Sequence, residues 1–409
     1  MPTTQAYAYK GRDANGKVVK GRVDAPSEIA VTSRLRTMGL TPVSITEAGT
    51  GTGLQRDINI PGFKKRVKLA DLAVMSRQMA TMISSGLSLL RTLNILAEQT
   101  ESKPLALILA QVRSDVETGS ALSEAMQKHA EEFPPLMINM VKAGETGGFL
   151  DDSLTSIADS FEADVKLRGT IKSALTYPVI VLIMAVIAVV AMLVFIVPVF
   201  KDMFAGLGGT LPLPTLMLVW LSAQMIWLVP VVVVGAILFS LWWQKNRHTE
   251  RVRRTVDPWK LKLPVFGPLM TKIAVARFTR NFSAMISAGV PILKALQIVG
   301  ETSGSWVVES ALRNVADSVR QGKSIAGPLA NEPVFPAMVT QMIAVGEDSG
   351  SLETMLGKIA DFYDAEVEST TEQLTSLIEP LMVAFIGVVV GGMIVALYLP
   401  VFGIFNLIK

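Results

Sequence analysis

Residues 178–200 read PVIVLIMAVIAVVAMLVFIVPVF, a stretch of 23 residues without a single charged side chain. As an α-helix this stretch would be about 34 Å long, enough to cross a hydrocarbon core of about 30 Å. Residues 214–243 are also free of charges, and a third apolar run covers 381–408. The sequence therefore predicts a mainly α-helical, polytopic membrane protein with transmembrane helices at 177–200, 214–243 and 377–405.

The positions of the basic residues predict the direction of each span. All but two of the 38 Lys and Arg residues fall within 1–176 or 244–376. Segments rich in Lys and Arg are retained in the cytoplasm. We therefore expect the N-terminus and both long segments to be cytoplasmic, with the short loop 201–213 and the tail 406–409 outside.

The chain contains an internal repeat at an offset of 202 to 203 residues. Two pairs of segments show it: MISSGL at 82–87 with MISAGV at 285–290, and AGETGGFL at 143–150 with VGEDSGSL at 345–352. Helical apolar spacing broken by glycine turns is typical of helix bundles. We predict two repeated cytoplasmic helical bundles, 69–176 and 244–376, each followed by a span. The middle span returns the chain to the cytoplasmic side.

Residues 1–48 show a different pattern. Alternating apolar residues flank the turn Asn15-Gly16, a helical stretch covers 27–38, and a short apolar strand follows near 43–45. This pattern predicts a small N-terminal α+β domain. Residues 49–68 are rich in glycine and end in basic side chains, which predicts a linker.

The sequence gives no indication of enzyme chemistry. It has no cysteine, only two histidines, and no phosphate-binding loop of the GxxxxGK[ST] type. We therefore predict a non-enzymatic protein with no catalytic residue, no metal site and no cofactor. The net charge of +3 is too small for this length to indicate nucleic acid as a partner.

Acidic residues cluster before the first and third spans. Their helical spacing places them near one face, which would suit a basic partner, a divalent cation or plain solvation. We favour a solvated helix face. The residues are Asp159, Glu162 and Asp164 in the first copy and Asp361, Asp364 and Glu366 in the second.

A Gly-Glu-x-x-Gly turn occurs in both copies. Glycine adopts backbone angles that other residues resist, so the glycines are explained by helix capping alone. A helix end does not need the glutamate, and this points to a surface contact as the second interpretation. The candidate contact residues are Gly144, Glu145, Gly148, Gly346, Glu347 and Gly350.

Taken in order, these motifs resemble a known protein family. The motifs are SRQMATMISSGL at 76–87, TRNFSAMISAGV at 279–290, the two Gly-Glu turns, ALTYPVIV at 174–181 and YLPVF at 398–402. They are similar to the inner-membrane platform proteins of type II secretion and type IV pilus assembly, over essentially the whole chain. The ending and the N-terminal segment resemble the pilus branch more closely, and the platform of a type II secretion pseudopilus is the alternative.

The resemblance implies a non-enzymatic platform in the bacterial inner membrane. It implies a hexameric cytoplasmic assembly ATPase docked on the bundles, pilin or pseudopilin subunits at the spans, other inner-membrane machine components, lipid contact and a homo-oligomer. Arg77, Gly86, Arg280 and Gly289 would then determine the fold of the modules. Gly387 and Gly391 form a GxxxG pair in the third span, available for helix packing.

A small membrane transporter is the less favoured function. A transporter buries polar groups near the middle of the bilayer to hold its substrate. Here Gln224 is the main polar side chain in the central parts of the spans. A signalling receptor would place more of its mass outside the membrane than this sequence predicts.

Overall fold

The computed structural model describes residues 5–12, 18–25, 28–39, 41–47, 67–206, 211–247, 249–264 and 266–404. The chain divides into two compact units, Met1–Lys65 and Arg66–Lys409, and each is described by itself. Most of the predicted linker, the Asn15-Gly16 turn and the tail 406–409 lie outside the described residues.

The first unit contains a three-stranded antiparallel sheet in the order β2-β1-β3. Its elements are β1 (Gln5–Arg12), β2 (Val18–Ala25), α1 (Glu28–Thr37) and β3 (Thr41–Glu47). Helix α1 buries Val31 and Leu35 against Tyr7 of the central strand. Tyr7 lies opposite Val23 of β2, so one face of the sheet carries this small core.

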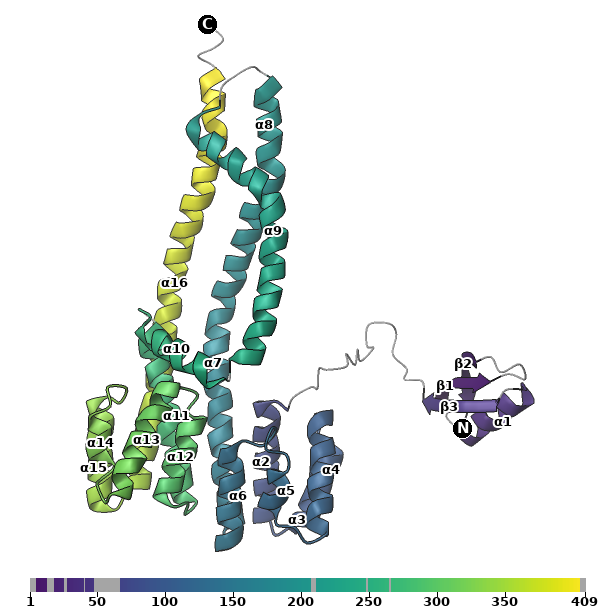
Figure 1. Cartoon of the computed structure of the whole chain (residues 1–409), viewed down its shortest axis with the longest axis vertical. Coiled ribbons are helices and arrows are strands. Elements are labelled where there is room, and N and C mark those ends of the chain that lie inside the picture. Colours follow the sequence, from purple (N-terminus) through teal and green to yellow (C-terminus); the bar gives the residue numbers. More distant parts are fainter. Residues whose placement is uncertain are drawn as a thin grey trace. The chain divides into compact units, whose positions relative to one another are not determined.

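The second unit begins with five short helices and the start of a long one. They are α2 (Leu69–Ser84), α3 (Leu89–Gln99), α4 (Lys103–Glu117), α5 (Leu122–Gln127), α6 (Pro135–Gly147) and α7 (Leu150–Ala191). The apolar stripe Leu154, Ile157 and Phe161 on α7 is buried, as its helical spacing requires. We call the helices α2–α6 together with the first part of α7 module 1 (Figure 1).

A second group repeats this order. Its helices are α11 (Phe266–Ser287), α12 (Ile292–Thr302), α13 (Trp306–Arg320), α14 (Ala326–Ala330), α15 (Ala337–Ser349) and α16 (Leu352–Ile404), preceded by α10 (Glu250–Lys262). We call α11–α15 and the first part of α16 module 2. The buried apolar side chains of both modules form one continuous core, so the two bundles are fused.

Among the described residues, three helices are long and apolar enough to cross a membrane, as the sequence predicts. The first is α7, which continues through the π-helical turn η1 (Met192–Ile196) into α8 (Val197–Gly206). The others are α9 (Leu213–Asn246) and α16. Both α7 and α16 run without a break from their module into the apolar stretch (Figure 1).

The first long helix continues farther than the predicted span. Residues 201–206 were expected in a loop, but they form the last turns of α8. The sequence Lys201-Asp202-Met203-Phe204-Ala205 contains no helix breaker before Gly206, which explains the extension.

Polar side chains attach α9 to the other two long helices. The Ser222 hydroxyl donates to the Leu193 carbonyl in η1, and the Thr215 hydroxyl donates to the Ala396 carbonyl in α16, both at 2.5 Å. A π-helical turn disturbs the regular hydrogen-bond ladder and leaves carbonyls open to such donors. The rest of this contact is apolar and includes Leu193 and Met393.

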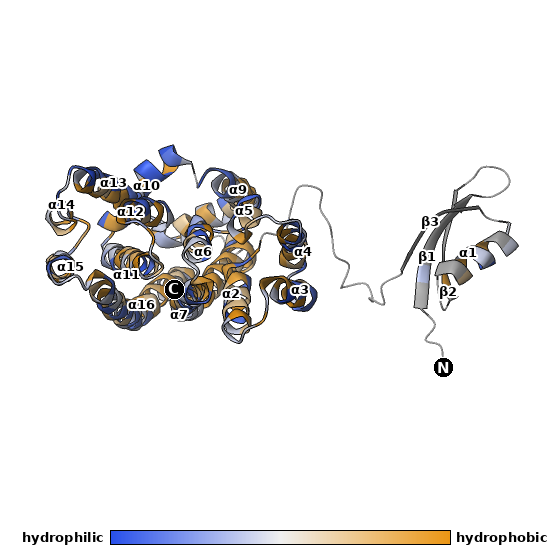
Figure 2. Cartoon of the chain, turned by 90° about the horizontal axis from the view of Figure 1, so that it is seen from below, coloured by the Kyte–Doolittle hydropathy of each residue, from blue (hydrophilic) through white to orange (hydrophobic). Residues whose placement is uncertain are grey.

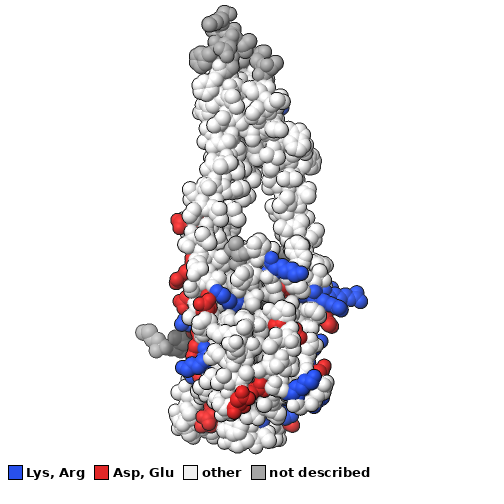
Figure 3. Space-filling model, turned by 90° about the vertical axis from the view of Figure 1, so that its left-hand side faces the viewer, with Lys and Arg blue, Asp and Glu red and all other residues white. Residues whose placement is uncertain are grey.

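Charged residues are concentrated on the modules. Figure 3 shows Lys, Arg, Asp and Glu over the lower part of one face, whereas the long helices above it are almost free of them. This distribution separates a part suited to water from a part suited to lipid.

Candidate functional site

The glutamate of each Gly-Glu turn caps a short helix in its own module. Glu145 accepts hydrogen bonds from the backbone N–H groups of Leu122 (2.5 Å) and Ser123 (3.0 Å) at the start of α5. Glu347 accepts equivalent bonds at the start of α14. Each glutamate therefore does cap a helix, but the capped helix is not the one that carries the glutamate. The sequence does not reveal this role, because each glutamate and the N–H groups that it binds are far apart in the chain.

The first glycine of each turn allows two helices to approach closely. A Cβ atom placed on Gly144 would lie 2.5 Å from Oγ of Ser153, and one on Gly346 would lie 2.9 Å from Cα of Leu352. Both glycines are buried. They are therefore packing residues at the α6–α7 and α15–α16 corners.

The last glycine of each turn ends a helix in the left-handed conformation. Gly148 (φ 77°) ends α6 and Gly350 (φ 67°) ends α15. Gly86 (φ 86°) and Gly289 (φ 65°) have the same conformation after α2 and α11. Only glycine adopts these angles without strain, which explains its presence at all four positions.

The acidic helix faces are exposed to solvent in part, as expected, but most of their carboxylates also pair with basic side chains. Nε and Nη2 of Arg77 donate to the two carboxylate oxygens of Glu162, each at 2.8 Å, and Asp159 binds the same guanidinium. The hydrogen bonds to Glu162 and Asp159 raise the pKa of Arg77. Arg280 pairs with Asp364 in module 2.

The repeat contained a signal for this pairing. Arg77 and Glu162 are 85 residues apart, and Arg280 and Asp364 are 84 apart, so the same basic–acidic pair occurs in both copies. Among the described residues, no group of three or more His, Asp or Glu is arranged to hold a metal ion.

A polar contact joins the two modules. The Arg277 guanidinium of α11 lies 2.8 Å from an Asp164 oxygen on α7, and burial lowers the pKa of Arg277. The Ser160 hydroxyl of α7 lies 2.9 Å from Oδ1 of Asn281 on α11. These contacts fix the face of module 2 that meets module 1.

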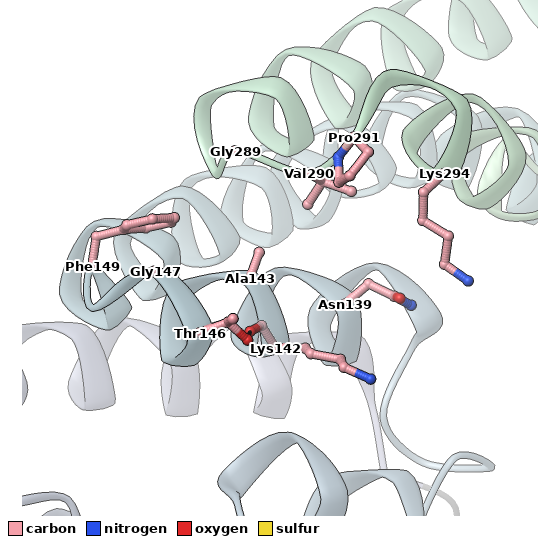
Figure 4. A pocket seen from close by; sticks show the side chains of 10 residues that line it. All are labelled: Asn139, Lys142, Ala143, Thr146, Gly147, Phe149, Gly289, Val290, Pro291 and Lys294. Carbon is pink, nitrogen blue, oxygen red and sulfur yellow. Dashed lines mark hydrogen bonds between the residues drawn. The ribbon is translucent and has the colours of Figure 1, made fainter.

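A pocket of about 540 Å³ lies at the seam between the modules (Figure 4). Its lining residues are Asn139, Lys142, Ala143, Thr146, Gly147 and Phe149 from module 1 and Gly289, Val290, Pro291 and Lys294 from module 2. The structure thus brings the Gly-Glu turn of module 1 together with the Gly289 turn of module 2. It does not bring the second Gly-Glu turn to Gly86.

The rim of this pocket is positively charged. Lys142 and Lys294 are both exposed, and in Figure 4 their side chains lie on the same side of the pocket with Asn139 between them. In the described part of the chain neither lysine has an acidic partner within ion-pair distance. Such a rim is suited to an acidic surface of another molecule.

The two glycines of the GxxxG pair make no close helix contact within the chain. A Cβ atom on Gly387 or on Gly391 would meet no other atom within 4 Å. Helix packing at these positions therefore stays a prediction for a partner outside this chain.

Comparison with known proteins places these features in a family. The model of "Type II secretion system (T2SS), protein F" matches residues 75–198 and again 278–400, and its N-terminal domain model matches 1–46. Relatives named "Type IV pilus assembly protein PilC" are 41% identical in Myxococcus xanthus and 43% identical in Thermus thermophilus. These alignments cover 99% and 97% of this chain and 96% and 98% of the relatives. "Type II secretion system protein F" of Xanthomonas campestris is 33% identical over 98% of this chain and 99% of the relative.

Proposed function

Because this chain belongs to the type II secretion system protein F family, we propose that it is the non-enzymatic inner-membrane platform of a type IV pilus assembly machine. The relatives named for type IV pilus assembly are 41% and 43% identical, and the relative named for type II secretion is 33% identical. This difference favours the pilus. The platform of a type II secretion pseudopilus is the alternative.

One observation carries this proposal: the family model matches twice, and each match runs from a helical module into an apolar helix. A helix that is continuous across that junction transmits a displacement of the module into the bilayer. A cytoplasmic ATPase docked on the modules would use this connection to move pilin subunits into a filament.

The charge distribution supports a topology with both modules in the cytoplasm. Nearly all Lys and Arg residues lie in 1–176 and 244–376, and cytoplasmic segments carry such an excess. The end of α8 and the C-terminus then lie on the other side. Both modules thereby face the compartment that contains ATP.

The basic rim of the seam pocket is the proposed contact for the ATPase. Glu145 and Glu347 are already bound to backbone N–H groups, so they are not available as primary contacts. In the first turn, Thr146 and Gly147 stay exposed and line the pocket together with Lys142 and Lys294. An acidic surface of the motor would complement these two lysines.

The long helices are the proposed contact for pilin subunits. Gly387 and Gly391 present an open, small-residue surface on α16, and such surfaces let a second helix approach closely in lipid. The apolar transmembrane segment of a pilin is a helix of the kind that fits there.

Copurification from membranes tests the platform function. The tagged wild-type chain should recover a hexameric cytoplasmic ATPase and a pilin, identified by mass spectrometry. Recovery of a pseudopilin instead would assign the chain to secretion. If neither subunit type is recovered, the platform function is wrong.

Charge reversal at the pocket rim tests the motor contact. Lys142→Glu with Lys294→Glu should keep the chain in the membrane but recover at least tenfold less ATPase. Lys323→Glu is the control, because Lys323 is also exposed and does not line the pocket. Equal recovery by both variants would remove the rim from the proposal while leaving the platform function intact.

A further inference from the structure

Besides the packing of α7 along α16, the two modules of one chain meet through different faces. We call the surface of α2 and α3 in module 1, or α11 and α12 in module 2, the front face. The back face is the surface of α6 and α7, or of α15 and α16, without the side on which α7 and α16 pack on each other. Within the chain, the front face of module 2 packs on the back face of module 1. In the described residues, no comparable contact joins the front face of module 1 to the back face of module 2.

Both modules stand in the same orientation. The long helices α7 and α16 lie side by side, and each runs from its module in the same direction (Figure 1). Viewed along these helices, α2 and α3 lie at one end of the pair of modules and α15 lies at the other (Figure 2). The interface is therefore head to tail. It leaves two surfaces unused among the described residues: the front face of module 1 and the back face of module 2.

The unused faces expose apolar side chains at positions that the repeat makes equivalent to the internal interface. Val74 on α2 is the equivalent of Arg277 and is 57% exposed. Phe362 on α16 is the equivalent of Ser160 and is 46% exposed. Val345 on α15 is 56% exposed. Each of the two unused faces therefore exposes apolar side chains where a repeat of the internal contact would place an interface.

The charges on the unused faces are complementary. Lys294 and Thr146 line the internal pocket from opposite modules. Their equivalents on the unused faces are Arg91 and Asp348, both exposed. If the internal contact were repeated between two copies, Arg91 of one would lie near Asp348 of the other. The equivalent of Lys142 in module 2 is Ala344, so this position carries no positive charge that would repel Arg91.

We propose that the front face of module 1 docks on the back face of module 2 in a second copy of this chain, repeating the internal interface. Such a contact is heterologous, so successive copies continue in one direction and close into a ring when the rotation allows. The common direction of the long helices keeps these copies in one plane of the membrane. The inference goes beyond the proposed function, because it requires neither the motor nor the filament.

Crosslinking between single cysteines tests the pairing, since the native chain has none. Gln78 and Phe362 are the equivalents of Asn281 and Ser160, whose side-chain oxygens lie 2.9 Å apart. Gln78→Cys and Phe362→Cys are placed in separate copies with different tags, coexpressed and oxidised in native membranes. We expect a disulfide between the two differently tagged chains. We expect no disulfide when either variant is expressed without the other.

The internal pair calibrates this experiment. Ser160→Cys with Asn281→Cys in one chain should form an intramolecular disulfide under the same oxidation. Links between two copies of Gln78→Cys, or between two copies of Phe362→Cys, would overturn the head-to-tail arrangement in favour of a symmetric one. Absence of any intermolecular link, with the internal pair oxidised, would also overturn it.

A charge exchange provides a second measurement that does not depend on cysteine geometry. Asp348→Arg alone should reduce the oligomer fraction in native membranes by at least fivefold. Adding Arg91→Asp to the same chain should restore it, because the opposite charges are re-established. Failure of the second change to restore assembly, while both variants accumulate normally, would contradict the proposed pairing of faces.

Discussion

Glu145 and Glu347 each act on the backbone of a helix that begins 21 to 23 residues earlier in the chain. Each carboxylate holds two N–H groups that would otherwise be left without partners at a short helix. Helices α5 and α14 have only 6 and 5 residues, so they depend on such contacts more than long helices do.

Removing the capping carboxylate should destabilise module 1. Glu145→Ala leaves two partly buried N–H groups unpaired, which we expect to cost about 2–3 kcal/mol. Thermal unfolding in detergent, followed by circular dichroism, measures the loss. Glu131→Ala is the matched control, because Glu131 is exposed in the same module. Equal stability of the two variants would show that the capping bonds contribute nothing.

The two arginines of the repeat have different environments. The Arg77 side chain is 38% exposed and that of Arg280 is 15% exposed. Exposed ion pairs contribute little because water screens them, whereas a buried charge that loses its partner is costly. We therefore expect the loss of Arg280 to destabilise its module more than the loss of Arg77 does, although the sequence gives both arginines the same motif.

At the scale of elements, the corners α6–α7 and α15–α16 decide how each module connects to its long helix. The corner needs a short gap between helices, which Gly144 and Gly346 provide. It also needs a left-handed residue to reverse the chain, which Gly148 and Gly350 provide. The Gly-Glu turn thus combines close packing, capping of another helix and chain reversal.

An alanine at the first corner should disturb this packing. The methyl group of Gly144→Ala would lie 2.5 Å from Oγ of Ser153 and 3.0 Å from Cα of Leu150, so we expect a loss of about 1–3 kcal/mol. Gly169→Ala in the open part of α7 is the control and should stabilise by about 0.5–1 kcal/mol. Chemical denaturation in detergent distinguishes the two. A stability loss no greater at Gly144 than at Gly169 would contradict the close-packed corner.

The whole molecule is organised by the division between charged modules and apolar long helices. The proposed topology, with both modules in one compartment, requires an even number of crossings between them. Helices α7 and α9 supply these two, and α16 supplies a third after module 2. The fused core means that the modules move together as one body on the cytoplasmic side of the proposed topology.

Labelling with an impermeant maleimide tests this topology. Asp202→Cys, exposed on α8, should react from outside the cytoplasmic membrane. Gly119→Cys and Gly322→Cys, exposed in modules 1 and 2, should react only after the membrane is opened. Labelling of either module from outside an intact membrane would reverse the orientation and end the case for contact with a cytoplasmic motor.

The sequence alone determined the features that depend on local composition and on repetition. Charge-free stretches of sufficient length predicted the three long apolar helices, because burial in lipid excludes charge whatever the tertiary structure. The motifs of the repeat, taken in order, identified the family. The structure adds that α7 and α16 each continue without a break from a module into such a stretch.

Only the tertiary structure decided which residues meet. The capping by Glu145, the pairing of Arg77 with Glu162 and the seam between Phe149 and Gly289 join residues far apart in the chain. No local periodicity encodes such contacts, because they depend on how helices pack in three dimensions. The sequence supplied two equivalent copies of each face, and packing determined that one pair is joined inside the chain while the other stays uncovered.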